Sequence, residues 1–194
     1  MNSYYISSSR KTTLFEGALA GDIRIRTVWG SESNGFGGSV PLFRKFLQPS
    51  SGTGTTSKDL MLKYQVLPLL RLAEMYLIRA EAKIRSTTKK DLQGAARDIM
   101  TIRSRATKSG HEKEMEVTEK DMTVDFILDE RGRELAGECQ RWFDLKRLGK
   151  LVDHIKLYNP DAAGNIKDFH KVRPIPQTQF DGMPDWTTLG QNDG

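Results

Sequence analysis

The sequence predicts a mainly α-helical protein with a small β-hairpin and long loops. Apolar side chains recur at helical spacing between residues 68 and 147, whereas residues 1–66 are rich in Ser, Thr and Gly. After Gly149 the helical spacing gives way to turn-forming residues. We therefore divide the chain into a loop-rich segment with a short hairpin (1–66), a helical core (67–149) and a loop-rich closing segment (150–194).

The composition excludes several classes of protein. The 194 residues suit one domain or at most two, with the 37% hydrophobic and 28% charged content of an ordinary globular chain. The net charge of +5 is spread along the chain, so we expect no nucleic-acid partner, which would need a concentrated basic patch. No apolar run approaches the roughly 20 residues of a membrane-spanning helix.

Cysteine and histidine usage predicts neither a disulfide nor a metal site. Cys139 is the sole cysteine, and its place within a helical pattern predicts a small buried side chain rather than a nucleophile. The three histidines are scattered without the spacing of zinc ligands. No phosphate loop or nucleotide fingerprint is present, and we expect no cofactor.

Two strands are predicted in the first segment. Residues 22–29 begin with alternating apolar and polar side chains and are rich in β-formers. A glycine-rich loop, Gly30 to Gly38, follows and contains Phe36. Residues 40–47 form the second candidate strand, which Pro41 restricts to a sheet edge or a late start.

Three helices follow, each with a start signal. Pro68 suits the first turn of the first helix, whose core stripe consists of Leu69, Leu72, Ala73, Tyr76, Leu77, Ala80 and Ile84. Thr88 is the predicted cap of the second helix, which Gly110 ends, and Thr118 is the predicted cap of the third. The second helix carries small alanines that allow close packing, so the first pair resembles a tetratricopeptide-like helical hairpin, although no repeat period proves one.

The stretch from Glu130 to Arg147 places charge inside an apolar stripe. Val124, Ile127, Leu128 and Leu135 follow the helical period, and Arg131 occupies an inward position among them. A buried charge is very costly unless it is paired and hydrogen-bonded. We therefore predict a matched charge network on this helix, followed by a turn and an aromatic-rich helix in which Trp142 packs in the core.

The spacing of this stretch also carries a family resemblance. Glu130-Arg131-x-x-Glu134-Leu135-x-x-Glu138-x-x-Arg141-Trp142-Phe143-Asp144-Leu145-x-Arg147 resembles the C-terminal signature of the SusD/RagB family, which often has Gly where this chain has Cys139. About two-thirds of the chain shares such motifs. The others are Asp22 with Arg24, Lys45 with Phe46, the string from Pro68 to Glu74, Arg103 with Arg105, Pro174-Ile175-Pro176, and Gln191-Asn192.

The resemblance implies a non-catalytic binding protein. Members of this family are outer-membrane, cell-surface lipoproteins that bind a glycan or another nutrient and partner a SusC-like TonB-dependent transporter. The sequence here has no signal peptide or lipidation site, so we expect an upstream lipidated segment and a further helical domain in the full-length form. A corollary is exposed apolar surface and self-association.

An enzymatic role for the carboxylates is not expected. Glu130 and Glu134 are spaced closely enough to be considered as a glycosidase pair. However, Arg131 and Arg133 stand beside them and lower carboxylate pKa values, whereas a general acid needs a raised pKa. We assign a structural charge network instead, comprising Arg71, Glu74, Glu81, Glu130, Arg131, Glu134, Glu138, Arg141 and Asp144.

Aromatic residues in the first segment are the candidate ligand contacts. Sugars present apolar C–H faces edged by hydroxyl groups, which suit an aromatic ring beside polar groups. Trp29 and Phe36 lie in or beside the glycine-rich loop rather than on a helical stripe. Alternatively, Trp29 ends a strand and packs on the first helix. A competing function is a helical protein-interaction module that binds no glycan.

Overall fold

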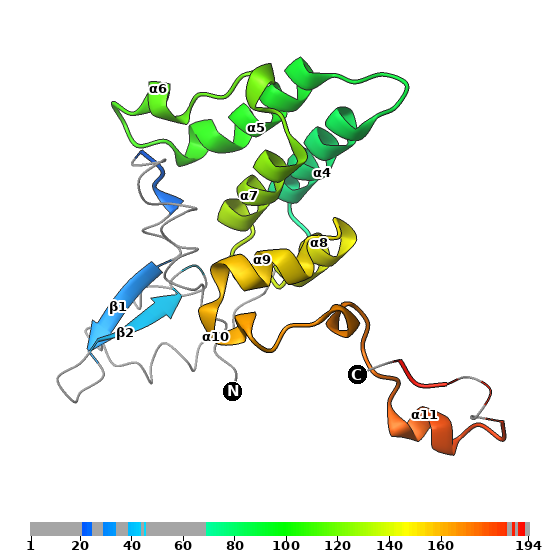
Figure 1. Ribbon diagram of the computed structural model, residues 1–194. Coiled ribbons are helices and arrows are strands. Elements are labelled where there is room, and N and C mark those ends of the chain that lie inside the picture. The colour runs from blue at the N-terminus through cyan, green and yellow to red at the C-terminus, as the bar shows by residue number, and fades with distance from the viewer. Residues whose placement is uncertain are drawn as a thin grey trace. The chain divides into compact units, whose positions relative to one another are not determined.

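The computed structural model describes residues 21–24, 29–33, 39–43, 45, 69–185, 188 and 190–192, with the two strands described by their backbone alone. These residues belong to two compact units, one ending at Arg141 and the other beginning at Trp142. Helices dominate the described chain, which confirms the predicted fold class (Figure 1). The tetratricopeptide-like character of the first helical pair stays a prediction.

A two-stranded antiparallel hairpin is present; its second strand overlaps the one predicted over 40–47, but its first strand begins only where the predicted one ends. Strand β1 (Trp29–Ser33) pairs with β2 (Ser39–Phe43), with Trp29 opposite Phe43. The prediction of a strand over 22–29 was wrong at its start, because Asp22 forms only an isolated bridge with Thr107. The β-forming pattern there reflects a segment that docks on a helix end rather than one that joins the hairpin.

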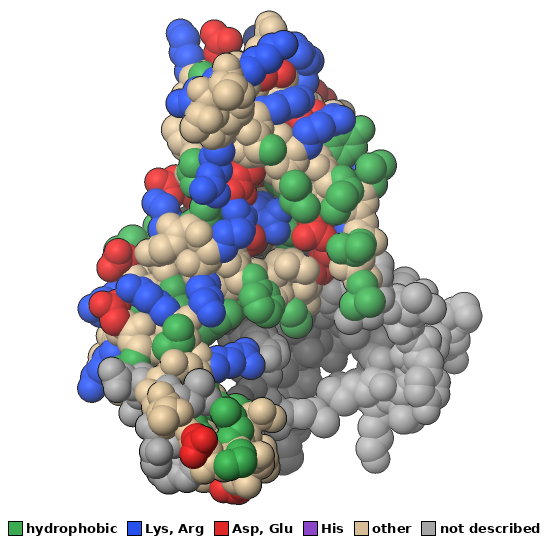
Figure 2. All heavy atoms as spheres, turned by 90° about the vertical axis from the view of Figure 1, so that its right-hand side faces the viewer, with side chains coloured by type: hydrophobic (Ala, Val, Ile, Leu, Met, Phe, Trp, Pro, Cys, Tyr) green, Lys and Arg blue, Asp and Glu red, His purple; other side chains and the backbone are tan. Residues whose placement is uncertain are grey.

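Helix α4 (Leu72–Arg85) begins later than Pro68 suggests. Arg71 is its N-cap in an extended conformation (φ −145°), so the preceding leucines lie outside the helix. Leu69 and Leu72, both predicted to be in the core, are 85% and 70% exposed. Figure 2, which looks at the right-hand side of Figure 1, shows hydrophobic side chains gathered at the surface. The exposed apolar side chains of α4 and the residues before it are Leu69, Leu70, Leu72, Met75 and Ile78.

Helix α5 (Leu92–Ala106) is capped by Asp91 and not by the predicted Thr88. The Asp91 carboxylate accepts a hydrogen bond from the Gly94 amide at 2.7 Å. It packs so closely that a Cβ added at Gly94 would collide with it. The short helix α6 (Glu112–Met115) follows Gly110, whose φ of +85° ends the preceding turn.

Helix α7 (Val124–Glu134) is capped by Thr123, whose hydroxyl accepts the Phe126 amide at 3.1 Å. Thr118, the predicted cap, instead forms a capping box with Asp121 around the 3-10 turn η1 (Glu119–Asp121). A capping residue needs an extended backbone just before the first turn, and both threonines satisfy this requirement. The sequence pattern thus predicted the correct type of capping residue, but at Thr118 instead of Thr123.

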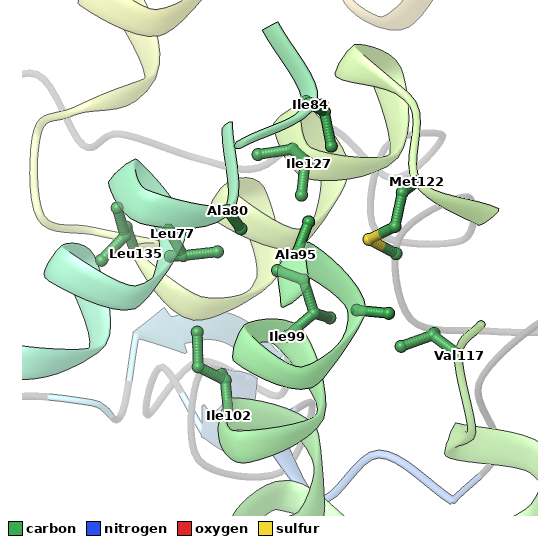
Figure 3. Close-up of a cluster of buried hydrophobic side chains, with 11 residues drawn as sticks. Leu77, Ala80, Ile84, Ala95, Ile99, Ile102, Val117, Met122, Ile127 and Leu135 are labelled. Atoms are coloured by element: carbon green, nitrogen blue, oxygen red, sulfur yellow. The ribbon is translucent and has the colours of Figure 1, made fainter. Parts of the chain in front are cut away.

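The hydrophobic core of the first unit lies where α4 packs against α5 and α7. Figure 3 shows side chains from these three helices and from the adjoining loop pointing toward one another. Alanines on α4 and α5 allow close approach of the two helices. The core residues are Leu77, Ala80, Ile84, Ala95, Ala96, Ile99, Ile102, Val117, Met122, Ile127 and Leu135.

The second unit consists of short helices. Helix α8 (Arg141–Arg147) leads into it, followed by α9 (Leu151–Tyr158), α10 (Pro160–Ala163), the 3-10 turn η2 (Asp168–Lys171) and α11 (Gln177–Asp181). Trp142 is only partly buried, contrary to its predicted place in the core, because α8 buries Asp144 and Leu145 instead. None of the described helices is long and apolar enough to cross a membrane.

Candidate functional site

A buried carboxylate, Glu130, is the centre of the most prominent polar cluster in the described chain. Its side chain is fully buried, and three arginines surround it. Arg103 donates from Nε and Nη2 to Oε2, both at 3.0 Å, and Arg133 donates to the same oxygen from Nη2 at 2.7 Å. Arg24 Nη1 lies 2.8 Å from Oε1 in an ion pair without the angles of a hydrogen bond.

The surroundings of Glu130 favour its ionised form. Burial alone disfavours the charged carboxylate, but the positive charges of Arg133, Arg24 and Arg103 more than offset it. The pKa of Glu130 is therefore held far below its usual range. An enclosed carboxylate that stays ionised near neutral pH has no proton to donate, so it does not suit a general acid.

A second carboxylate, Glu134, lies one helical turn further along α7 and joins different segments of the chain. Its carboxylate oxygens lie 2.7 Å from Arg71 Nη1, 2.6 Å from Arg105 Nη2 and 3.1 Å from Arg24 Nη1. Burial opposes ionisation here too, but the hydrogen bond from Arg71 and the charges of Arg24 and Arg105 lower the pKa of Glu134. Residues from before β1, before α4 and on α5 thus meet on one side chain.

The third carboxylate, Glu138, follows the end of α7 and binds two cations. Arg71 donates from Nε to both oxygens at 2.8 and 3.0 Å, and Lys45 Nζ donates to Oε1. Lys45 also donates to the backbone carbonyls of Glu134, at 2.7 Å, and Ala136, at 3.2 Å. Burial lowers the pKa of Lys45 despite the opposing effect of Glu138. We call the whole cluster the charge hub: Arg24, Lys45, Arg71, Arg103, Arg105, Glu130, Arg133, Glu134 and Glu138.

A tight turn after α7 brings Glu138 back toward the hub. Gly137 has a φ of +76° and Cys139 a φ of +60°, both in the left-handed region. The prediction that Cys139 is a buried apolar residue was wrong, since its side chain is exposed. The turn sends this side chain outward, so the chain keeps the turn expected of glycine with a cysteine in its place.

The segment Gly21–Arg24 docks on the end of α5. The Ile23 amide donates to the Ala106 carbonyl at 2.9 Å, and the Lys108 amide donates to the Gly21 carbonyl at 2.7 Å. Asp22 accepts a fork of hydrogen bonds from Arg24, with Nη2 at 2.6 Å and Nε at 2.9 Å. This fork aims the Arg24 guanidinium at Glu130 and Glu134.

The remaining residues predicted for the network lie at separate places. Arg131 is buried, with Nη2 3.8 Å from Glu74, and Glu81 pairs with the half-exposed Arg85 at 2.9 Å. Arg141, the first residue of α8, donates to the Leu128 carbonyl on α7 at 2.7 Å. In the second unit, Asp144 pairs with Arg147 at 3.1 Å. The structure therefore brings together Arg71, Glu130, Glu134 and Glu138 from the predicted set.

Sequence reasoning did not assign five basic residues to the hub: Arg24, Lys45, Arg103, Arg105 and Arg133. Four of them belong to the short motifs noted for their family resemblance, far from Glu130 in the sequence. A count of charges would have found the signal, because Glu130, Glu134 and Glu138 outnumber the two arginines of α7. A similar cluster joins buried Asp98 to Arg79 and Lys83, at 2.5 and 2.8 Å.

In the second unit, the C-terminal motif Gln191-Asn192 binds the backbone of the proline-flanked segment around Ile175. The Gln191 side chain accepts the Ile175 amide at 2.7 Å and donates to the Ile175 carbonyl at 2.9 Å. Asn192 Nδ2 donates to the Arg173 carbonyl at 2.7 Å. The side chains thus imitate a strand partner for the proline-flanked segment, which cannot form a regular ladder.

The described residues contain no group of three His, Cys, Asp or Glu side chains placed to hold a metal ion. An open groove of about 470 Å³ lies between α5 and η1, and no aromatic side chain lines it. Its lining residues are Gln93, Ala96, Arg97, Met100, Val117, Thr118, Glu119 and Lys120.

The predicted ligand contacts fall at the limit of what the structure describes. Trp29 is the first residue of β1, where only the backbone is described. Phe36 lies outside the described residues. The proposal that both contact a ligand therefore stays a prediction, as does the alternative that Trp29 packs on the first helix.

Comparison with known families shows to which family this chain belongs. The sequence model of the SusD family matches residues 30–194, which includes all three hub glutamates. The chain belongs to the SusD family. Three residues of the signature noted between residues 130 and 147, namely Glu130, Glu134 and Glu138, belong to the hub.

Curated relatives of the chain also carry the SusD name. "SusD-like protein P25" of Formosa agariphila is 33% identical over 124 residues, which is 60% of this chain and 22% of the relative. "Starch-binding protein SusD" of Bacteroides thetaiotaomicron is 31% identical over 134 residues, or 66% of this chain and 21% of the relative. The chain thus spans about a fifth of these relatives' length. No solved structure matches it.

Proposed function

We propose that this SusD-family chain serves in non-catalytic binding of a glycan or another nutrient at the outer-membrane surface. The observation that carries this proposal is the family match over residues 30–194. The name of the Bacteroides thetaiotaomicron relative, a starch-binding protein, makes starch oligosaccharides the first ligands to test. The state of the buried carboxylates supports a role without catalysis, because the pKa values of Glu130 and Glu134 are lowered rather than raised.

In the full-length form we place the protein at the cell surface as a lipoprotein. There it would pass its ligand to a SusC-like TonB-dependent transporter. This partner and this location come from the family resemblance. A complex purified from outer membranes through a tag on the protein should contain a TonB-dependent barrel, and a tagged protein recovered only from the cytoplasm would contradict the proposal.

The ligand contact that we propose is Trp29, with Phe36 as a second candidate. Trp29 opens β1 opposite Phe43, at the base of the hairpin. Removing an aromatic anchor from a binding site costs about 2 kcal/mol or more. Trp29→Ala should therefore weaken maltohexaose binding by the full-length protein roughly tenfold or more while leaving the melting temperature nearly unchanged.

Isothermal titration with maltohexaose measures the affinity, and Phe143→Ala is a matched control because Phe143 is an exposed aromatic of the second unit. A control variant that lost affinity as Trp29→Ala did would contradict the assignment of the site. Retained binding with lost stability in Trp29→Ala would place that side chain in the core.

A helical protein-interaction module is the second candidate function. The observation that favours it is the exposed apolar surface on α4, where Leu72, Met75 and Ile78 face solvent. A glycan array separates the two functions. Reproducible oligosaccharide hits support the first, and a blank array together with a purified protein partner that Ile78→Lys releases supports the second.

A further inference from the structure

We propose that Arg24 and Lys45 are positioning residues that fasten both ends of the β1–β2 hairpin to the charge hub. Arg24 stands five residues before Trp29, the first residue of β1, and Lys45 stands two residues after Phe43, the last residue of β2. Both side chains reach the carboxyl end of α7. This inference rests on the proposed function only for the ligand titration described last.

The hairpin needs such anchors for its own stability. An isolated two-stranded hairpin is marginally stable at best in water, and β1 and β2 are each five residues long. The described structure contains no third strand beside them. Tertiary contacts at the two ends of the hairpin are a source of the stability that the short ladder lacks.

The anchor before β1 is rigid. Asp22 and Arg24 are both buried, and the fork between them leaves Arg24 Nη1 directed at Glu130, at 2.8 Å, and at Glu134, at 3.1 Å. The backbone of Gly21 and Ile23 is tied to the end of α5 by two further hydrogen bonds. Because this anchor is part of the buried core of the hub, its removal would test folding rather than hairpin position.

The anchor after β2 lies at the rim and can be removed separately. Lys45 is half-buried, and its ammonium group has three acceptors on the turn after α7, namely Glu138 and the carbonyls of Glu134 and Ala136. Three acceptors match the three donors of an ammonium group, so the side chain has one defined position. Arg71 still binds Glu134 and Glu138 when Lys45 is absent, so the hub itself survives.

The consequence is a division of labour within the first unit. The apolar core and the remaining ion pairs of the hub hold α4, α5 and α7 together, whereas the hairpin keeps its place through the two cations that flank it. If Trp29 contacts the ligand, Lys45 sets where that contact lies without touching the ligand itself.

Hydrogen exchange followed by mass spectrometry on the whole chain tests the anchor directly. Lys45→Met keeps the length of the side chain but removes the ammonium group. We expect amide exchange in residues 29–43 to accelerate roughly tenfold or more, because charged hydrogen bonds are lost, while amides of α5 and α7 keep their protection. Lys45→Arg, which retains a charged donor for Glu138, should restore most of the hairpin protection.

Lys90→Met, a substitution of an exposed lysine, is the matched control and should leave hairpin exchange unchanged. Unchanged exchange of residues 29–43 in Lys45→Met would overturn the proposal. Equal acceleration throughout α5 and α7 would also overturn it, because Lys45 would then support the fold in general.

Titration of the full-length variants with maltohexaose separates this inference from the proposed function. Faster hairpin exchange together with weaker binding in both Lys45→Met and Trp29→Ala supports the anchor and the proposed site together. Faster hairpin exchange with normal binding by Trp29→Ala supports the anchor and contradicts the proposed ligand contact at Trp29.

Discussion

Cys139 occupies a backbone conformation that suits glycine. Its φ of +60° brings the Cβ of an L residue close to the following carbonyl, which costs about 1–2 kcal/mol. Because the side chain is exposed, its removal leaves no cavity. Cys139→Gly should therefore raise the free energy of unfolding by about 0.5–1 kcal/mol after the greater entropy of the unfolded glycine is subtracted. Urea denaturation followed by circular dichroism measures the change.

Two further substitutions separate backbone strain from loss of the thiol. Cys139→Ser keeps a Cβ in the same conformation and should leave stability nearly unchanged. Gly137→Ala places a Cβ at a φ of +76° and should lower stability by about 1 kcal/mol. A gain in Cys139→Ser equal to that of Cys139→Gly would show that the thiol, not the backbone, is responsible.

The carboxylates of the hub also predict how stability depends on pH. Burial opposes their ionisation, but the surrounding cations hold the pKa values of Glu130, Glu134 and Glu138 below the usual 4.5. A group with a lowered folded-state pKa contributes stability that is complete above its unfolded pKa and is lost as the pH falls toward the folded one. The free energy of unfolding should therefore decrease steadily below about pH 4.5.

Glu138→Gln provides the test of that pH dependence. Lacking one of these titrating groups, the variant should lose less stability than the native protein between pH 7 and pH 3.5 in urea denaturation. Glu116→Gln, which changes an exposed glutamate, should keep the native slope. Equal slopes for all three proteins would mean that Glu138 is not coupled to folding.

Among the helices, periodicity predicted which faces are buried better than it predicted where each helix starts. The stripe of Leu77, Ala80 and Ile84 is buried as its spacing requires, because burial depends on a repeated pattern along many residues. The start of α4 depends instead on Arg71, which adopts an extended backbone and reaches Glu134 and Glu138. That long-range pairing is invisible to a pattern read within one helix.

The same limit applies to the candidate site. Glu130 and Glu134 stand out in the sequence, since they are four residues apart on one helix. Their partners Arg24 and Arg103 lie 106 and 27 residues from Glu130 in the chain, so only the fold brings them together. The buried glutamates indicated that cations must lie beside them, and only the tertiary structure shows which arginines and lysines these are.

A matched pair of leucines on α4 tests the placement of the core. Leu77 is fully buried between the helices, whereas Leu72 is mostly exposed. Leu77→Ala should lower the free energy of unfolding by about 2–5 kcal/mol through lost burial and a residual cavity. Leu72→Ala should change it by less than about 0.5 kcal/mol. Similar losses for both variants in thermal denaturation would contradict the orientation of α4.

For the whole molecule, exposed apolar surface predicts self-association of this chain. Leu70, Leu72, Met75 and Ile78 present adjoining apolar side chains on and just before α4. Such patches mark interaction sites or aggregation-prone surfaces. Light scattering over a concentration series should show an increase in average mass, and the double variant Leu72→Lys with Ile78→Lys should suppress it. A mass that stays monomeric at every concentration would contradict this expectation.

The central claim at this scale is that the charge hub holds the first unit together rather than binding ligand or catalysing a reaction. Glu130→Gln removes the charge that Arg24, Arg103 and Arg133 share, and leaves three buried cations without it. Breaking a buried ion pair in this way costs about 3–5 kcal/mol. The most direct test is the free energy of unfolding of Glu130→Gln at pH 7 by urea denaturation, with Glu116→Gln as the exposed control. We predict a loss of about 3–5 kcal/mol for Glu130→Gln and almost none for the control. A Glu130→Gln protein as stable as the native chain would contradict the claim.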